Sequence, residues 1–428
     1  MTLRFLFHGM AVLWTAWLAF AQPASKVLTL EDCIRLAGAA QSSATIARQQ
    51  VEIARLGVAQ ARAGFLPQSR ISSGFTYNSP LLYDRGTFSF IPLNGIREYA
   101  SLFAAGVELD TSGKLRAELA RAQAERNAAA AGLRLSERDL KRAVTAAYLR
   151  VLLARHVVEV TRESLDEARS FENRTRLLLA NGEAAQADVA KAAAETAFLE
   201  QGLNAAELDA QLAAQELASF WTTAVNDPLP LADVLTQPIQ PPEGAAGAAG
   251  QPFMKRPEFL LLEAQKQGFL ADSRRARAEL FPQLGLVFQY GLDSTQVRWS
   301  DRGHAAFLTL NVPVFDWLKA RSASRQFQLR AQQVEAGRSM AERTFSREYQ
   351  SAATRVRLIY RQIAITASQV KSAEENLRLS RLRYEGGEGA ALDVVTAQQQ
   401  LTQARTNYYA ALAGYLNARA DLEVASGR

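Results

Sequence analysis

Two glycine-containing turns, each inside a long proline-free segment, constrain what this chain can fold into more than any other feature. The later turn is Gly386-Gly387-Glu388-Gly389, and the earlier one is Asn181-Gly182-Glu183. Glycine reaches left-handed backbone conformations without steric cost and therefore ends helices. No proline occurs over 93–227 or 314–428, so a long helix can enter and leave each turn. The sequence predicts two helical hairpins with tips at 181–183 and 386–389.

The two hairpins belong to an internal repeat. An offset of 205 residues superimposes the later tip on the earlier one and also pairs Lys319 with Lys114. Each helix that runs to a tip therefore has room for about 67 residues, or roughly 100 Å at about 1.5 Å per residue. Upstream, Pro282 follows Pro67 at an offset of 215. The length is thus conserved along the helices and differs only in the segment that precedes them.

The N-terminus and the junction between the repeats complete the predicted organisation. Arg4 and an apolar run ending at Ala19-Phe20-Ala21 are typical of a secretory signal, and the run is short for a membrane anchor. The junction is rich in Pro, Gly and Ala, with a short helix expected near Leu231. The predicted order is a signal peptide over 1–21, a first repeat over 22–223, a linker over 224–256 and a second repeat over 257–428.

The helices that return from the tips carry apolar residues at heptad spacing. Such spacing marks a coiled-coil seam, and the many alanines allow helices to approach closely. The residues of this seam are Leu199, Leu203, Ala206, Ala210, Ala213 and Leu217 in the first copy, and Leu401, Ala404, Tyr408, Ala411, Tyr415, Ala418 and Leu422 in the second. Long antiparallel helical hairpins are therefore the main predicted structure.

Before each long helix the hydrophobic period changes from about 3.6 to about 2 residues, which indicates β-strands. Hairpins are expected at about 68–110 and 283–314, with one apolar face. That face carries Ile71, Phe75, Phe103, Val107, Leu284, Leu286, Phe288, Leu308, Leu310, Val312 and Val314. Strands of about ten residues with this pattern are typical of transmembrane β-strands, although hairpins of soluble domains share it. Open strand edges cannot face lipid, so membrane-spanning strands would require several chains to share one barrel.

Composition and residue spacing argue against several functional classes. The net charge of +6 is interleaved along helical faces, which indicates solvated helices rather than a nucleic-acid site. His8, His156 and His304, the last expected in a hairpin loop, lack metal-ligand spacing. No phosphate-binding glycine loop or nucleophile elbow is present. The lone Cys33 is expected to be a small core residue. We expect no enzyme activity, no cofactor and no metal site.

Taken in order, the motifs resemble TolC-like outer-membrane efflux proteins. The resemblance covers nearly the whole mature chain, and the order and duplication of the motifs make it specific. The motifs are Leu28-Thr-Leu-Glu-Asp-Cys-Ile-Arg-Leu-Ala37, Arg256-Pro257-Glu258, the strand starts Leu66-Pro67 and Phe281-Pro282, Tyr384-x-x-Gly387 and Leu392-Asp393-Val394.

The resemblance implies a trimer that builds one tube through the outer membrane and periplasm of a Gram-negative bacterium. Twelve strands would form a β-barrel in the outer-membrane lipid, and the helices would continue it as an α-helical barrel. The tips would dock a periplasmic adaptor and, through it, an inner-membrane pump. The implied docking residues are Asn181, Gly182, Glu183, Gly386, Gly387 and Glu388. Substrate would pass without chemical change.

The resemblance also assigns candidate gate residues. Asp393 falls on the position of a lumen aspartate ring, although an acidic residue here can also cap the helix that leaves the tip. Tyr384 and Asp188 fall on gate positions that bond between neighbouring helices. Thr396 stands where some members have a second aspartate, and Gly389 stands where some have an arginine that ties the gate shut. Closure by that arginine is therefore not expected here.

Three functions are compatible with these residues. The first is an outer-membrane duct for efflux, and the second is a duct for type I protein secretion. The third belongs to a different class, a soluble periplasmic coiled-coil scaffold. Membrane fractionation would separate the scaffold from the ducts, because a barrel requires detergent for extraction.

Overall fold

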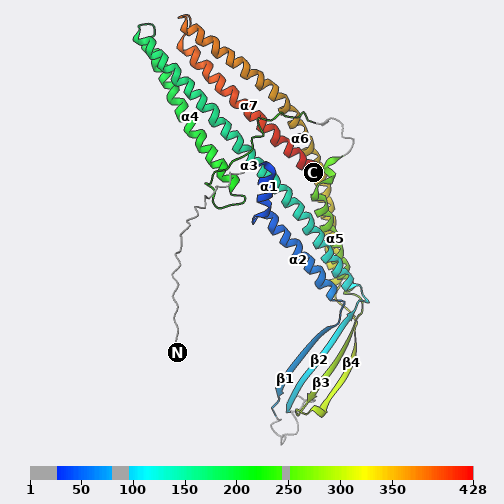
Figure 1. Cartoon of the computed structure of the whole chain (residues 1–428). Helices are drawn as coiled ribbons and strands as arrows, with labels where there is room; N and C mark the ends of the chain where they lie inside the picture. Colours follow the sequence, from blue (N-terminus) through cyan, green and yellow to red (C-terminus); the bar gives the residue numbers. More distant parts are fainter. Residues whose placement is uncertain (1–26, 80–95, 243–250, 428) are drawn as a thin grey trace, which may run out of the picture.

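A computed structural model describes residues 27–79, 96–242 and 251–427. The predicted signal peptide lies outside the described residues. Helices form an elongated body with a β-sheet at one end and the two hairpin tips at the other (Figure 1). The elements are α1 (Leu30–Ala39), α2 (Ser43–Ala63), β1 (Gln68–Tyr77), β2 (Arg97–Leu109), α3 (Lys114–Ala180), α4 (Gln186–Ala218), η1 (Pro252–Lys255), α5 (Pro257–Ala278), β3 (Gln283–Ser294), η2 (Trp299–Asp301), β4 (Arg302–Asn311), α6 (Lys319–Glu385) and α7 (Ala391–Ala425).

The long helices α3 and α6 each contain 67 residues, which confirms the predicted length. Each begins where an aspartate accepts backbone N–H groups that have no partner inside the helix. Asp110 Oδ1 accepts from the Leu115 N–H at 2.9 Å, and Asp316 Oδ2 accepts from the Ala320 N–H at 2.9 Å. None of the described helices is both long and apolar enough to cross a membrane.

The helices pair through the predicted seams. Near the tips, α3 packs with α4 and α6 packs with α7, and towards the sheet α2 and α5 take the places of α4 and α7 (Figure 1). Leu199, Leu217, Leu401 and Tyr415 are at most 5% exposed. Small residues such as Ala404, which is fully buried, let the helices approach closely.

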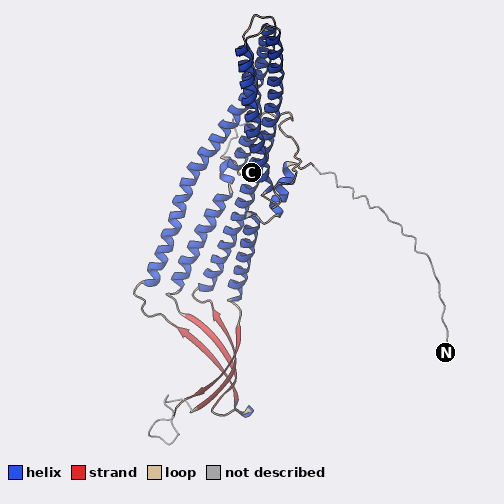
Figure 2. Ribbon diagram, turned by 90° about the vertical axis from the view of Figure 1, so that its left-hand side faces the viewer, coloured by secondary structure: helices blue, strands red, loops and turns tan. Residues whose placement is uncertain are grey.

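The four strands form one antiparallel sheet in the order β1-β2-β3-β4. Its register aligns Ile71, Phe103, Tyr290 and His304 across the sheet, so the predicted apolar positions share one face. The polar face is more covered than the apolar one, since Ala104 is 5% exposed whereas Phe103 is 40% exposed. The sheet therefore curves with its polar face on the inside, and Figure 2 shows the strands bending away below the helices.

Two details of the predicted hairpins are wrong. His304 lies in β4, because the strand begins at Arg302 and leaves only a short turn around η2. β4 ends at Asn311, so Val312 and Val314 lie beyond the strand. After these residues the chain turns into α6 through two left-handed residues, Trp317 and Leu318.

The segment after α4 packs across the middle of the helices. Leu231 pairs with Leu28 as an isolated β-bridge, so the short helix expected near Leu231 is not formed. The Tyr148 hydroxyl donates to the Ala232 carbonyl at 2.5 Å. Cys33 is fully buried in the same core, as predicted, and burial followed by the charge of Asp32 raises the pKa of its thiol to about 11.

The Arg256-Pro257-Glu258 motif anchors the start of the second repeat. Arg256, 6% exposed, donates to Glu258 at 2.7 Å and to Glu348 of α6 at 2.6 Å, and its guanidinium lies 3.7 Å from the Phe345 ring centroid. Arg138 of α3 donates to Glu258 at 2.9 Å. Burial acts to raise the pKa of Glu258, but hydrogen bonds from both arginines outweigh it and leave that pKa below its usual value.

Candidate functional site: the helical tips and the groove between them

Both tips have the same backbone hydrogen-bond pattern. At the first tip the Glu183 N–H donates to the Leu178 carbonyl at 2.8 Å and the Gly182 N–H donates to the Leu179 carbonyl at 3.0 Å. This pair of bonds defines a Schellman motif, which requires a left-handed residue after the helix cap. Gly182 supplies it with φ +83°. The turn that the sequence predicts is therefore present.

The second tip repeats this pattern with three glycines in different roles. Gly387 takes the left-handed position with φ +72°, and the Glu388 N–H donates to the Arg383 carbonyl at 2.9 Å. Gly386 precedes it with φ −80°, a conformation open to any residue. A Cβ at Gly389 would lie 3.1 Å from the Tyr384 nitrogen. A side chain at position 389 would thus need the α6 terminus to shift.

The six predicted docking residues are all exposed at the ends of the hairpins. They are Asn181, Gly182, Glu183, Gly386, Gly387 and Glu388. The two tips lie side by side at the end of the molecule opposite the sheet (Figures 1 and 2). This placement leaves them free to contact another protein.

The two candidate gate aspartates lie in the first turns of α4 and α7. Asp393 is exposed, and its Oδ2 accepts from the Ala390 N–H at 3.3 Å, so the side chain caps α7 within one chain. Asp188 is partly exposed in the matching turn of α4. An acidic side chain here is also stabilised by the helix dipole. Capping and a role in the pore are compatible, since one oxygen of Asp393 can cap while the charge faces solvent.

Tyr384 is packed inside the chain rather than presented on its surface. It is 9% exposed, and its ring meets that of Phe171 from α3 edge to face at a centroid distance of 5.2 Å. Its hydroxyl is buried and has no hydrogen-bond partner among the described residues. Val394 and Ala391, both fully buried, complete the apolar cluster beneath the second tip. Tyr384 and Asp393 thus belong to the same tip but face different surroundings.

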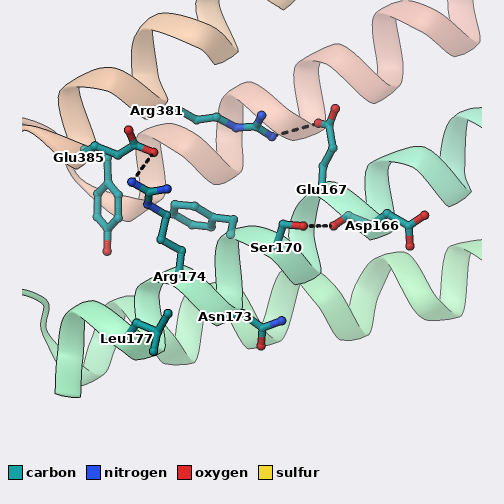
Figure 3. Close-up of a pocket in the computed structure, with 10 residues that line it drawn as sticks. Asp166, Glu167, Ser170, Asn173, Arg174, Leu177, Arg381 and Glu385 are labelled. Atoms are coloured by element: carbon teal, nitrogen blue, oxygen red, sulfur yellow. Dashed lines mark hydrogen bonds and ion pairs between the residues drawn. The ribbon is translucent and has the colours of Figure 1, made fainter. Parts of the chain in front are cut away.

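A groove of about 710 Å³ separates the two hairpins beside this cluster. Two ion pairs join α3 to α6 along it (Figure 3). Arg381 lies 3.1 Å from Glu167, and Arg174 lies 3.3 Å from Glu385, measured between guanidinium nitrogen and carboxylate oxygen. All four side chains are at least one third exposed, so each pair contributes at most about 1 kcal/mol. Sequence reasoning missed these pairs, because charged residues on helix faces have many possible partners.

Farther from the tips, a buried carboxylate of α4 is bonded to an exposed glutamine of α7. Gln399 Nε2 donates to Glu195 Oε2 at 2.6 Å, and Glu195 is 6% exposed. Burial raises the pKa of Glu195, and the bond from Gln399 offsets this only in part. Among the described residues, no group of three His, Cys, Asp or Glu side chains is placed to hold a metal ion.

Comparison with known sequences gives one family and two relatives. The model of the outer membrane efflux protein family matches residues 39–223 and 254–428. Cobalt-zinc-cadmium resistance protein CzcC of Cupriavidus metallidurans is 24% identical over 424 residues, which cover 96% of this chain and 92% of that protein. Outer membrane protein OprJ of Pseudomonas aeruginosa is 26% identical over 159 residues, or 36% of this chain and 33% of OprJ.

Solved structures have the same fold. VceC of Vibrio cholerae superimposes with a TM-score of 0.80 at 18% identity, covering 93% of this chain and 96% of that one. The open state of the MtrE channel of Neisseria gonorrhoeae gives a TM-score of 0.79 at 20% identity, covering 93% and 88%. The fold is that of outer-membrane channels, and with most of its length matched by the family model, this chain belongs to the outer membrane efflux protein family.

Proposed function

We propose that this protein is the outer-membrane exit duct of a tripartite efflux system and that it works as a homotrimer. The observation that carries this proposal is a four-stranded sheet with an apolar outer face and, within the described residues, an open edge on both β1 and β4. Open edges cannot face lipid, so β4 of one chain must pair with β1 of the next. Three chains would close a twelve-stranded barrel.

The helical body supports a route across the periplasm. α3 and α6 each extend for roughly 100 Å, which carries the tips far from the sheet. The exposed tips at 181–183 and 386–389 would dock a periplasmic adaptor that links the duct to an inner-membrane pump. Asp393, Tyr384 and Asp188 lie at this end and would form the gate. Transport through such a duct needs no catalytic residue, so we propose no enzyme activity.

The alternatives receive less support. A soluble scaffold would leave large apolar side chains in water on one face of the sheet, including Ile71 (76% exposed), Leu308 (70%) and Leu310 (61%). A secretion duct for proteins would share the fold. Efflux is favoured because CzcC, which aligns over nearly the whole chain, is named a resistance protein.

Fractionation and mass measurement test the duct directly. We expect the protein to remain in the outer-membrane fraction after high-salt and alkaline washes and to run as a trimer in mild detergent. Deleting its gene should make the cells more sensitive to toxic solutes. If the protein were instead a secretion duct, deletion would stop the export of a protein. Release of the protein by the washes would contradict the shared barrel. So would a monomeric mass for protein whose spectrum still shows its β-structure.

A further inference from the structure

On the mainly polar inner face of the described sheet, Leu102 and Phe307 are the two largest apolar side chains, and the smaller Val287 lies opposite Phe307. Leu102 on β2 and Phe307 on β4 alternate with the residues of the apolar face, so both point to the inside. They are related by the repeat offset of 205. Phe307 is 47% exposed, so the described part of the chain leaves it partly uncovered.

The register places Leu102 and Phe307 at the same height in the sheet. Through β2, Gln68 of β1 aligns with Val287 of β3. The repeat equivalent of Gln68 on β3 is Gln283, which lies four residues nearer the helices than Val287. Strand tilt causes this displacement, as in any closed barrel. Through β3, Leu102 of β2 aligns with Gly303 of β4, and its repeat equivalent Phe307 lies four residues nearer the helices than Gly303. Since this displacement equals that of the first strand pair, Leu102 and Phe307 lie at the same height.

The levels directly above and below carry smaller side chains on β2 and β4. Ala100 and Ala305 lie one level towards the far end of the sheet, and Ala104 and Thr309 lie one level towards the helices. Leu102 and Phe307 therefore project further inward than their neighbours on the same strands.

We propose that in the trimer three copies each of Leu102 and Phe307 form an apolar collar on the inner wall, and that the collar contacts the apolar part of amphipathic organic cations in transit. This inference rests on the proposed duct. A twelve-stranded barrel with strands about 4.8 Å apart and tilted about 40° has a backbone diameter of about 24 Å. The collar therefore narrows the lumen without closing it.

An acidic level accounts for the preference for cations. Glu98 of β2 lies four residues outward from Leu102 on the inner face. On β3, Asp293 lies four residues outward from Gln289, which is at the height of the collar. Glu98 and Asp293 thus share one level, with two carboxylates per chain. An organic cation with aromatic or alkyl groups can meet the carboxylates and the collar together.

Planar-bilayer recordings on the purified full-length channel test the collar. We expect tetraphenylphosphonium to block the current of the wild-type channel. The double variant Leu102→Thr/Phe307→Thr should weaken this block at least about tenfold, because two apolar contacts per chain are lost. The matched control is Ala100→Thr/Ala305→Thr, the repeat-related pair one level outward, which should shift the block less than about twofold. Block by hydrophilic hexaamminecobalt(III) should be equal in all three proteins.

Unchanged block in the collar variant, or an equal loss in the control, overturns the inference. If the collar variant fails to insert, the wild-type channel decides with alkyltrimethylammonium ions of increasing length. Each added methylene should strengthen block about threefold to fourfold at an apolar site. No dependence on length overturns the collar while leaving the duct in place. A wild-type protein that forms no trimeric channel refutes the proposed function itself.

Discussion

The two adjacent glycines of the second tip provide a test with an internal control. Gly387 has φ +72°, and a Cβ built on it would meet no atom of the described residues within 4 Å. The cost of Gly387→Ala is therefore the backbone cost of a left-handed alanine alone, about 1–2 kcal/mol per chain. Gly386 has φ −80°, and its Cβ would lie 3.4 Å from the Leu382 carbonyl oxygen, at the edge of ordinary contact.

Gly386→Ala should consequently leave the tip intact or stabilise it by up to about 1 kcal/mol, because alanine reduces the entropy of the unfolded chain. The two variants add the same methyl group at neighbouring exposed positions. They differ only in the backbone conformation that the methyl group must tolerate. Because both variants lower the entropy of the unfolded chain alike, the expected difference between them at the tip is the cost of a left-handed alanine, about 1–2 kcal/mol.

Amide hydrogen exchange measures this difference locally. The Glu388 N–H, which donates to the Arg383 carbonyl at 2.9 Å, should exchange about 5–30-fold faster in Gly387→Ala and no faster in Gly386→Ala. Adaptor binding and efflux should fall only in the Gly387 variant, with unchanged amounts of protein in the membrane. Equal exchange rates in the two variants would refute the left-handed turn. Faster exchange with normal efflux would refute docking at this tip.

Further expectations concern the gate and the junction. Asp393→Asn keeps an acceptor for the Ala390 N–H, so it should lower cation preference in bilayer recordings without changing stability. Asp393→Ala should lower cation preference and also reduce the free energy of unfolding by about 0.5–1 kcal/mol. Unchanged selectivity in both variants would mean that Asp393 only caps α7. Tyr384→Phe should change closed-state conductance modestly, and a large rise would reveal a bond to a neighbouring chain. Glu258→Gln should cost about 2–3 kcal/mol in urea unfolding at neutral pH. The folded pKa of Glu258 lies below the ordinary glutamate pKa of about 4.3, so the carboxylate should stabilise the protein fully above that pH. The stabilisation should disappear as the pH falls through the lower folded pKa. A stability difference between wild type and Glu258→Gln that stays constant across this pH range would contradict the prediction.

The tips could be predicted from sequence because a Schellman turn is a local structure. Gly182 and Gly387 each follow a long proline-free helix, and one left-handed residue decides where that helix ends. The strands could also be predicted from sequence, since alternation alone sorts side chains such as Phe103 onto one face. The register of the strands could not be predicted, because it depends on pairing between segments far apart in the chain.

Contacts between distant segments decide the structure at some positions. A short helix is expected near Leu231, but the Leu231 backbone pairs with Leu28 and its segment is held by Tyr148, both distant in sequence. The ion pairs of the groove were missed for the same reason. Arg174 could pair with many acidic residues on neighbouring helix faces, and only the packing of α3 against α6 selects Glu385. Tertiary contacts thus override or complete local preferences at these positions.

The equal lengths of α3 and α6 follow from what each helix connects. Both helices join a sheet at one end and a tip at the other, so their 67 residues must bring the two tips to one level. One inserted residue would move a tip by about 1.5 Å and rotate its docking face by about 100°. The hairpin between Pro67 and Val107 tolerates extra residues because loop length does not affect the tips. If the two tips dock one partner together, as we propose, this requirement explains why the repeat offset stays at 205 along the helices and changes only between Pro67 and Val107.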